Sequence, residues 1–159
     1  MIWIIIILGI AADYFTKRWA LGALASGQVI DLIPGYLDFS YVENRGAAFG
    51  IFQGQIRVLG IISVVVAAGL LFYLLKTKDL HVMMKVSLSL IVGGALGNAY
   101  DRFIYTFVVD FIHFHIRDSW HFPTFNVADM LVVIGAGLMI LFILLIEPKI
   151  EAKKQVGKL

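Results

Sequence analysis

Four apolar stretches dominate the chain, with polar segments between them. Residues 58–75 carry no charged side chain over 18 positions, and residues 130–146 carry none over 17. Residues 86–100 are also uncharged, whereas the first stretch is long enough only if it continues past Asp13 to about residue 24. A helix needs about 20 mostly apolar residues to cross a bilayer. The pattern therefore predicts four membrane-spanning helices, at about 2–24, 57–75, 86–104 and 127–147.

The segments between these stretches have a different pattern. Pro34-Gly35 predicts a turn, and apolar and polar side chains alternate from residue 37 to residue 42, as in a strand. Residues 108–116 are rich in β-branched and aromatic side chains, which favour an extended strand. We therefore expect one domain over residues 1–159, an all-α integral membrane fold with a small extracytoplasmic β element on its outer face.

Composition supports a membrane protein. Hydrophobic residues make up 60% of the 159, charged residues make up 15%, and the mean hydropathy is +0.90. Soluble domains are about 45–50% apolar and about 25% charged, so a soluble or disordered chain is excluded. The absence of cysteine excludes disulfides and thiolate chemistry. A net charge of +2 gives no indication of nucleic-acid binding.

Lysines indicate the direction of insertion. Seven of them follow the second and fourth stretches, at positions 76, 78, 85, 149, 153, 154 and 158. By the positive-inside rule this side is cytoplasmic, and an even number of spans puts both termini there. Because no basic residue precedes Lys17, as a signal peptide would require, we expect the first helix to be retained.

Polar residues inside the predicted spans fall at similar depths. With a rise of about 1.5 Å per residue, Asp13 and Asn98 each lie about 18 Å from the cytoplasmic end of their span, and Asp129 lies about 27 Å from it. Asp101 and Arg102 follow Asn98 by one turn. All therefore belong to the outer half of a hydrocarbon core about 30 Å thick. Polar residues at such depths usually mark a functional site.

Local spacing adds pairs to this cluster. Asp13 and Lys17 are four residues apart with the acid first, which favours an ion pair. Asn98 and Arg102 have the same spacing and are expected on one helix face. Gly93 and Gly97 form a G-x-x-x-G motif, which permits close helix contact.

Asp110 and Asp129 differ from the other acids because neither has a basic neighbour in the sequence. Two such carboxylates brought together share one proton, since both cannot ionise easily. The pair could then deprotonate a water and protonate a leaving amine, as amide hydrolysis requires. Two other interpretations remain open: Asp129 could cap the last helix, and intramembrane acids also serve ion paths and structural pairs.

Two further chemistries have weaker support. His113, His115 and His121 could form a zinc site, although no H-E-x-x-H motif occurs. A Ser–Lys dyad of Ser89 and Lys85 would lie at the cytoplasmic end, away from the polar cluster.

Five motifs, in this order along the chain, resemble the signal peptidase II family, the lipoprotein signal peptidases of bacteria. They are D-Y-F-T-K at 13–17, N-R-G-A-A-F-G at 44–50, G-G-A-L-G-N-A-Y-D-R at 93–102, V-D-F at 109–111 and F-N-V-A-D at 125–129.

The resemblance implies an intramembrane aspartic endopeptidase that removes the signal peptide of prolipoproteins by cutting before the diacylglyceryl-modified Cys. It makes Asp110 and Asp129 the catalytic pair, without metal or cofactor. The residues it implies in substrate binding or support are Asp13, Lys17, Asn44, Gly46, Asn98, Asp101, Arg102 and Asn126. Its implied partners are lipid-modified prolipoprotein signal peptides, membrane lipids and a cyclic-peptide inhibitor of the globomycin type. The implied location is the bacterial cytoplasmic membrane, with the active site near the outer surface.

An alternative function uses the same acids in a small polytopic transporter or proton-conducting protein. Such a protein needs a polar path to the lysine side, yet residues 1–12, 65–75 and 134–146 contain no Asp, Glu, His, Lys or Arg side chain. A purely structural subunit would leave the converging polar groups unexplained.

Overall fold

The computed structural model describes residues 1–46 and 54–150. Its element order is α1 (Ile2–Ala23), β1 (Ile30–Ile33), β2 (Leu37–Asn44), α2 (Ile56–Lys76), α3 (Val82–Ile104), β3 (Val108–Ile116), β4 (Trp120–His121), α4 (Val127–Leu141) and a π-helical segment η2 (Phe142–Ile146). Three of the seven lysines predicted to be cytoplasmic, at positions 153, 154 and 158, lie outside the described residues, as do residues 47–50 of the second motif.

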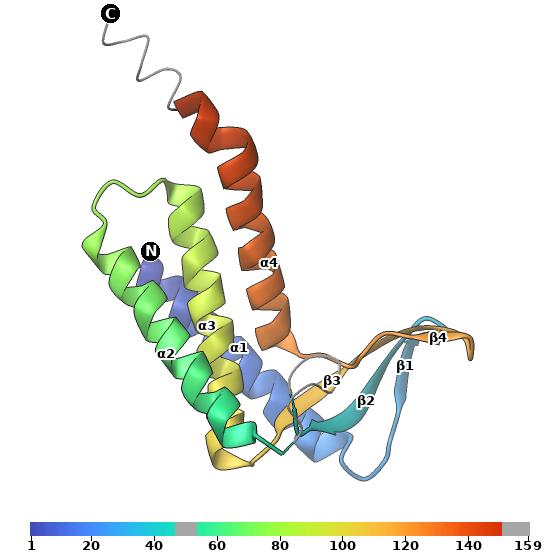
Figure 1. The fold of residues 1–159 in the computed structure, drawn as a ribbon. Coiled ribbons are helices and arrows are strands. Elements are labelled where there is room, and N and C mark those ends of the chain that lie inside the picture. Colours follow the sequence, from blue (N-terminus) through green and yellow to red (C-terminus); the bar gives the residue numbers. More distant parts are fainter. Residues whose placement is uncertain (47–53, 151–159) are drawn as a thin grey trace, which may run out of the picture.

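The helices form a bundle from which the sheet projects at one end (Figure 1). α3 lies centrally and packs against α1, α2 and α4. The N-terminus and the α2–α3 connection lie at the end of the bundle away from the sheet, as does the C-terminal part of the last helix (Figure 1). The predicted mostly helical architecture with a small β element is confirmed.

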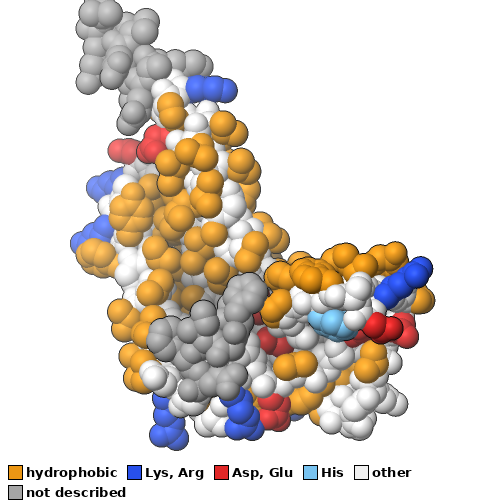
Figure 2. All heavy atoms as spheres, turned by 45° about the vertical axis from the view of Figure 1, so that its right-hand side comes forward, with side chains coloured by type: hydrophobic (Ala, Val, Ile, Leu, Met, Phe, Trp, Pro, Cys, Tyr) orange, Lys and Arg blue, Asp and Glu red, His pale blue; other side chains and the backbone are white. Residues whose placement is uncertain are grey.

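Length and composition make three of the described helices able to cross a membrane: Ile56–Lys76, Val82–Ile104 and Val127–Ile150. α1 is a helix over the predicted range, but it carries Asp13, Lys17 and Arg18. α3 begins four residues before the predicted start of its span, because the His81 side chain caps it by accepting the Met83 N–H at 3.2 Å. Large apolar side chains such as Ile4, Val133 and Leu144 are more than 60% exposed, and orange side chains cover the helical part of Figure 2.

Small residues bring α3 close to its neighbours. A Cβ at Gly97 would lie 2.6 Å from the Asp13 carboxylate of α1, and a Cβ at Gly94 would collide with the Ala128 carbonyl oxygen of α4. Gly93 faces the backbone of Ile6. The close contact predicted from the G-x-x-x-G motif is therefore confirmed, and it allows polar side chains of three helices to meet.

The sheet is antiparallel with strand order β1-β2-β3-β4. β2 pairs with β3 from Leu37 opposite Phe114 to Asn44 opposite Val108, with a bulge between Phe39 and Val42. β3 matches the range predicted from its β-branched and aromatic composition, and β2 extends two residues beyond the range predicted from alternation.

Aromatic packing fixes the sheet on the end of α1. Trp19, Phe39 and Phe111 form an edge-to-face trio with ring centroids 5.3–6.0 Å apart. Beneath it, Val109 and Phe111 pack with Ala20 and Leu24 in a buried cluster. Because these two residues flank Asp110, the packing also fixes the position of that carboxylate.

Candidate active site

Asp110 and Asp129 are brought together by the backbone between β3 and α4. Phe125, two residues before the start of α4, exchanges hydrogen bonds of 2.8 and 3.0 Å with Ile112 of β3. Asn126 therefore lies beside Asp110, and its Nδ2 donates to the Asp110 Oδ1 at 2.6 Å. The same side chain is the N-cap of α4.

Asp129 closes a capping box with Asn126. Its backbone N–H donates to the Asn126 Oδ1 at 2.9 Å, and its Oδ2 accepts the Asn126 backbone N–H at 3.2 Å. The capping interpretation of the sequence is thus correct in kind, with Asn126 at the cap and Asp129 three residues later. The other carboxylate oxygen, Oδ1, accepts the Asn98 Nδ2 at 2.7 Å. Asp129 therefore takes part in the cap of α4 with one carboxylate oxygen and binds the polar cluster with the other.

The two asparagines link the acids. Asn126 Nδ2 also lies 3.1 Å from Asn98 Oδ1, so that Asp110, Asn126, Asn98 and Asp129 form a continuous hydrogen-bonded chain. On the other side, Asn44 Nδ2 donates to the Asp110 Oδ2 at 2.9 Å. Both oxygens of Asp110 are thereby held by amide donors.

Burial changes the acidity of Asp110. Its side chain is 2% exposed, and Asp129 is half-buried. Desolvation, with a smaller contribution from the negative charge of Asp129, raises the pKa of Asp110 to about 7, against the hydrogen bonds from Asn44 and Asn126. A carboxyl group with this pKa can exchange a proton at neutral pH, which suits acid–base chemistry.

Lys17 forms the centre of a buried ion cluster beneath this chain. Its Nζ lies 2.8 Å from Asp13 Oδ2, 3.0 Å from Asp101 Oδ2 and 2.8 Å from Asn98 Oδ1. The predicted pair with Asp13 is confirmed, and Asp101 is a second partner that helical spacing did not reveal. The three donors of the ammonium group are satisfied at a side chain that is 2% exposed.

Both acids of this cluster also bind backbone. Asp13 Oδ1 accepts the Ala128 N–H in the first turn of α4 at 2.8 Å, and Asp101 Oδ2 accepts the Val109 N–H at 3.1 Å. The cluster therefore fixes α1 and α3 against the two segments that carry Asp129 and Asp110.

Two of the residues predicted for the site, Gly46 and Arg102, lie at the edge of the polar cluster. The buried Gly46 donates its N–H to Asn44 Oδ1 at 3.0 Å, which orients the Asn44 amide toward Asp110. Arg102, predicted to share a helix face with Asn98, donates from Nη1 to Ser63 of α2 at 3.4 Å in the described part of the chain.

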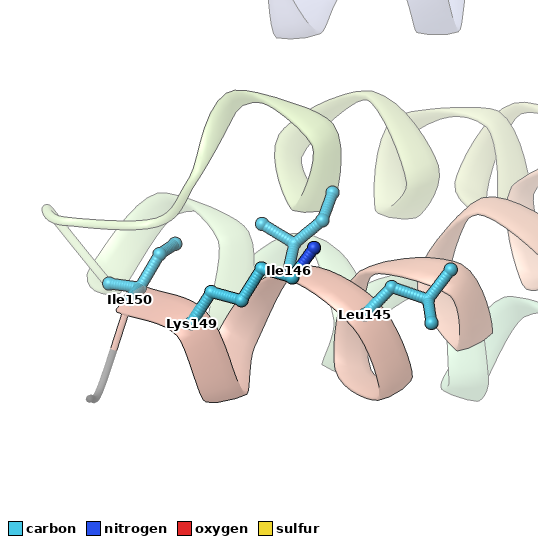
Figure 3. A pocket seen from close by; sticks show the side chains of 4 residues that line it. All are labelled: Leu145, Ile146, Lys149 and Ile150. Carbon is cyan, nitrogen blue, oxygen red and sulfur yellow. The ribbon is translucent and has the colours of Figure 1, made fainter. Parts of the chain in front are cut away.

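One hollow of about 290 Å³ is lined by Leu145, Ile146, Lys149 and Ile150 (Figure 3). It lies at the end of the bundle remote from the sheet. It contains no acid and lies far along the helix from Asp129, so we give it no role in chemistry.

The fold and site define a helical membrane protein with buried carboxylates where the bundle meets the sheet. A family model described as signal peptidase (SPase) II matches residues 5–145. Lipoprotein signal peptidases from Clostridium novyi (strain NT) and Clostridium tetani (strain Massachusetts / E88) are 46% and 50% identical over 141 residues, which are 89% of this chain and 95% and 90% of theirs. A solved bacterial membrane enzyme superposes with a TM-score of 0.81 at 32% identity over 90% of this chain and 87% of its own.

The chain belongs to the signal peptidase II family. It is therefore a peptidase of the membrane, as the sequence motifs predicted. This result favours the peptidase over the alternative of a transporter or proton-conducting protein.

Proposed function

We propose that the chain is an intramembrane aspartic endopeptidase, which removes the signal peptide of prolipoproteins by hydrolysing the bond before a diacylglyceryl-modified Cys. The observation that carries this proposal is the pair Asp110 and Asp129, joined through Asn126 and Asn98. The family, and the names of the relatives from two Clostridium species, support the substrate class.

In the proposed reaction one acid is protonated and the other is ionised. The raised pKa of Asp110 assigns the proton to that residue, so Asp129 takes the role of the base in the proposed pair. Asp129 takes a proton from a water, and the hydroxide oxygen bonds to the scissile carbonyl carbon. Asp110 protonates the carbonyl oxygen to give a gem-diol. Asp129 then passes the proton it took from water to the nitrogen of the Cys, while Asp110 takes back a proton from one diol hydroxyl, so that the C–N bond breaks and a carboxylic acid forms.

The remaining polar residues position this pair or its substrate. Asn98 and Asn126 orient the two carboxylates, and Lys17 with Asp13 and Asp101 holds Asn98 in place. Asn44, held by Gly46, is proposed to contact the substrate backbone because it already binds Asp110. Arg102 is proposed for the same role because it is half-buried and lies one turn beyond Asn98 on α3. The mechanism needs no metal or cofactor. The proposed ligands are prolipoprotein precursors, lipids and inhibitors of the globomycin type.

Lipid modification of the substrate is expected to accelerate cleavage by at least about a hundredfold. Burial of about four CH₂ groups of the acyl chains contributes about 3 kcal/mol, and each 1.4 kcal/mol is a factor of ten. The test compares precursors of one sequence, with and without the diacylglyceryl group, for cleavage by purified protein in lipid vesicles. Equal rates for the two precursors would mean that the lipid is not recognised.

Cleavage should decline as the pH rises through about 7, because Asp110 then loses the proton that the reaction needs. Just below pH 7 the protonated form of Asp110 is retained, so activity should persist there. The measurement is the pH dependence of kcat/KM with a lipidated precursor. A rate that keeps rising between pH 6 and pH 9 would contradict the assignment of the proton to Asp110.

We further propose that all four helices span the bacterial cytoplasmic membrane, with both termini inside and the site near the outer surface. The charges of α1 support this, since Asp13 and Lys17 are 1% and 2% exposed and therefore hidden from lipid. The lysines at 76, 78, 85 and 149 support the direction of insertion.

Single cysteines can test this topology because the chain has none of its own. Ser26→Cys and Ser119→Cys should react with an impermeant thiol reagent added outside intact cells. Asp79→Cys, in the α2–α3 connection, should react only after the cells are opened. The reverse labelling pattern would refute both the orientation and the location of the site.

A further inference from the structure

Three histidines and an aspartate gather on the sheet, apart from the proposed catalytic pair. Asp38 of β2 lies opposite His113 of β3, and His121 of β4 lies opposite His115. Residues two apart on a strand point to the same face, so His113 and His115 point to the face opposite to that of Asp110. The pale blue side chains in Figure 2 lie on the sheet surface, beside acidic side chains in red.

The carboxylate and the imidazoles converge closely. Asp38 Oδ2 lies 2.9 Å from His113 Nδ1 and 3.2 Å from His115 Nε2. One ligand atom from each of the three residues lies within 4.8 Å of the others. Atoms that bind one zinc ion at about 2.0–2.1 Å are about 3.3 Å apart in a tetrahedral site. The cluster therefore has nearly the spacing of a metal site before any ion binds.

The hydrogen bonds indicate which imidazole nitrogens are free to bind a cation. His115 Nδ1 lies 3.1 Å from the Arg117 carbonyl oxygen, which can only accept, so Nδ1 carries a hydrogen. In a neutral ring, Nε2 then presents a lone pair toward Asp38 Oδ2, which is also an acceptor. A cation between the two atoms would satisfy both. A ligating imidazole commonly donates its other N–H to a carbonyl in this way.

The burial of Asp38 adds to the need for a cation beside its carboxylate. Asp38 is 6% exposed, and its Oδ1 is buried without a hydrogen-bond partner among the residues that the structure describes. Burial of a carboxylate is costly unless it is paired or coordinates a metal. The side chains of His113 and His115 are 19% and 14% exposed, so that an ion could reach the cluster from water.

We propose that Asp38, His113 and His115 form a binding site for a divalent transition metal ion, with Zn²⁺ the best fit, completed by water. Two imidazole nitrogens and one carboxylate oxygen are ligands that zinc prefers. His121 Nδ1, 3.2 Å from His113 Nε2, orients that ring, and the three imidazoles lie nearly parallel, within 5°. The ion would join β2 to β3 and so stabilise the strand that carries Asp110, without entering the cleavage reaction.

The test is calorimetric titration of Zn²⁺ into the full chain in detergent, purified without a polyhistidine tag and treated with chelator. The expected result is one ion per chain, with an increase in Tm on binding. No saturable binding to the parent protein would overturn the proposal, whatever its variants do.

Variants then identify the ligands. His115→Gln and Asp38→Asn should each weaken binding by more than about a hundredfold, and His121→Ala by about 10–100-fold. His81→Ala is the matched control, because this fourth histidine caps α3 at the other end of the bundle. If His115→Gln binds as tightly as the parent protein, the site is wrongly assigned. Cleavage of a lipidated precursor in the presence of chelator is a separate measurement, so this inference can fail while the proposed function stands.

Discussion

Replacing either Asp110 or Asp129 with Asn is expected to lower the single-turnover rate of precursor cleavage by about 10⁴-fold. Residues that act as one unit each remove most of the rate when lost, so the double variant should be little worse than either single variant. The structure gives the reason: the two acids are linked through Asn126 and Asn98, and an amide can neither accept the proton of water nor donate one as an acid.

Measuring Tm distinguishes a loss of catalysis from a loss of folding in these variants. Asp110→Asn removes the cost of burying a carboxylate that is 2% exposed, but it also turns an amide NH₂ group toward one of the two amide donors that Asp110 now accepts. The two effects oppose each other, so the Tm of this variant should stay close to that of the parent protein. Asp31→Asn is the matched control, since this acid is exposed on β1 and should cleave normally. Turnover at the parental rate by either Asp110→Asn or Asp129→Asn would remove that residue from the proposed pair.

Replacing Lys17 with Met is expected to destabilise the protein by about 3–5 kcal/mol, the usual cost of removing one partner from a buried ion pair. The substitution preserves most of the side-chain volume but leaves Asp13 and Asp101 facing each other without a cation. It also releases Asn98, whose amide binds Asp129, so that kcat should fall as well. Thermal unfolding in detergent and single-turnover cleavage measure the two effects.

The neighbouring Arg18 offers a control of the same charge. Arg18 is exposed on α1, so Arg18→Met should change the free energy of unfolding by no more than about 0.5 kcal/mol, as an ordinary surface substitution does. Asp13→Ala should resemble Lys17→Met and act mainly through stability, because Asp13 binds Lys17 and the Ala128 N–H. An Asp13→Ala protein as stable as its parent but inactive would place Asp13 in catalysis or substrate binding.

The sequence alone predicted the features that depend on residues close to one another along the chain. Uninterrupted apolar stretches predicted the helices, alternation predicted β2, and a separation of four residues predicted the pair of Asp13 and Lys17. The convergence of polar residues from different helices followed from their similar depths, because each depth can be counted from one end of a span.

Contacts between elements were harder to predict. Asp101 binds Lys17 from another helix, and Arg102 turns to Ser63 because the rotation of α3 against its neighbours is set by glycine contacts. Asp38 joins the histidines only through the register of β2 on β3, which includes a bulge. A slip of one residue would turn Asp38 to the other face, and nothing in the local sequence fixes that register.

We propose that this chain alone hydrolyses the bond before a lipid-modified Cys with two carboxylates and no metal. The most direct measurement is mass analysis of the products that the purified, reconstituted protein makes from a lipidated precursor peptide in the presence of chelator. The account predicts two products, an intact signal peptide with a free carboxyl terminus and a lipopeptide that begins with the modified Cys. An uncut precursor, a cut at another bond, or activity that returns only when zinc is added would contradict it.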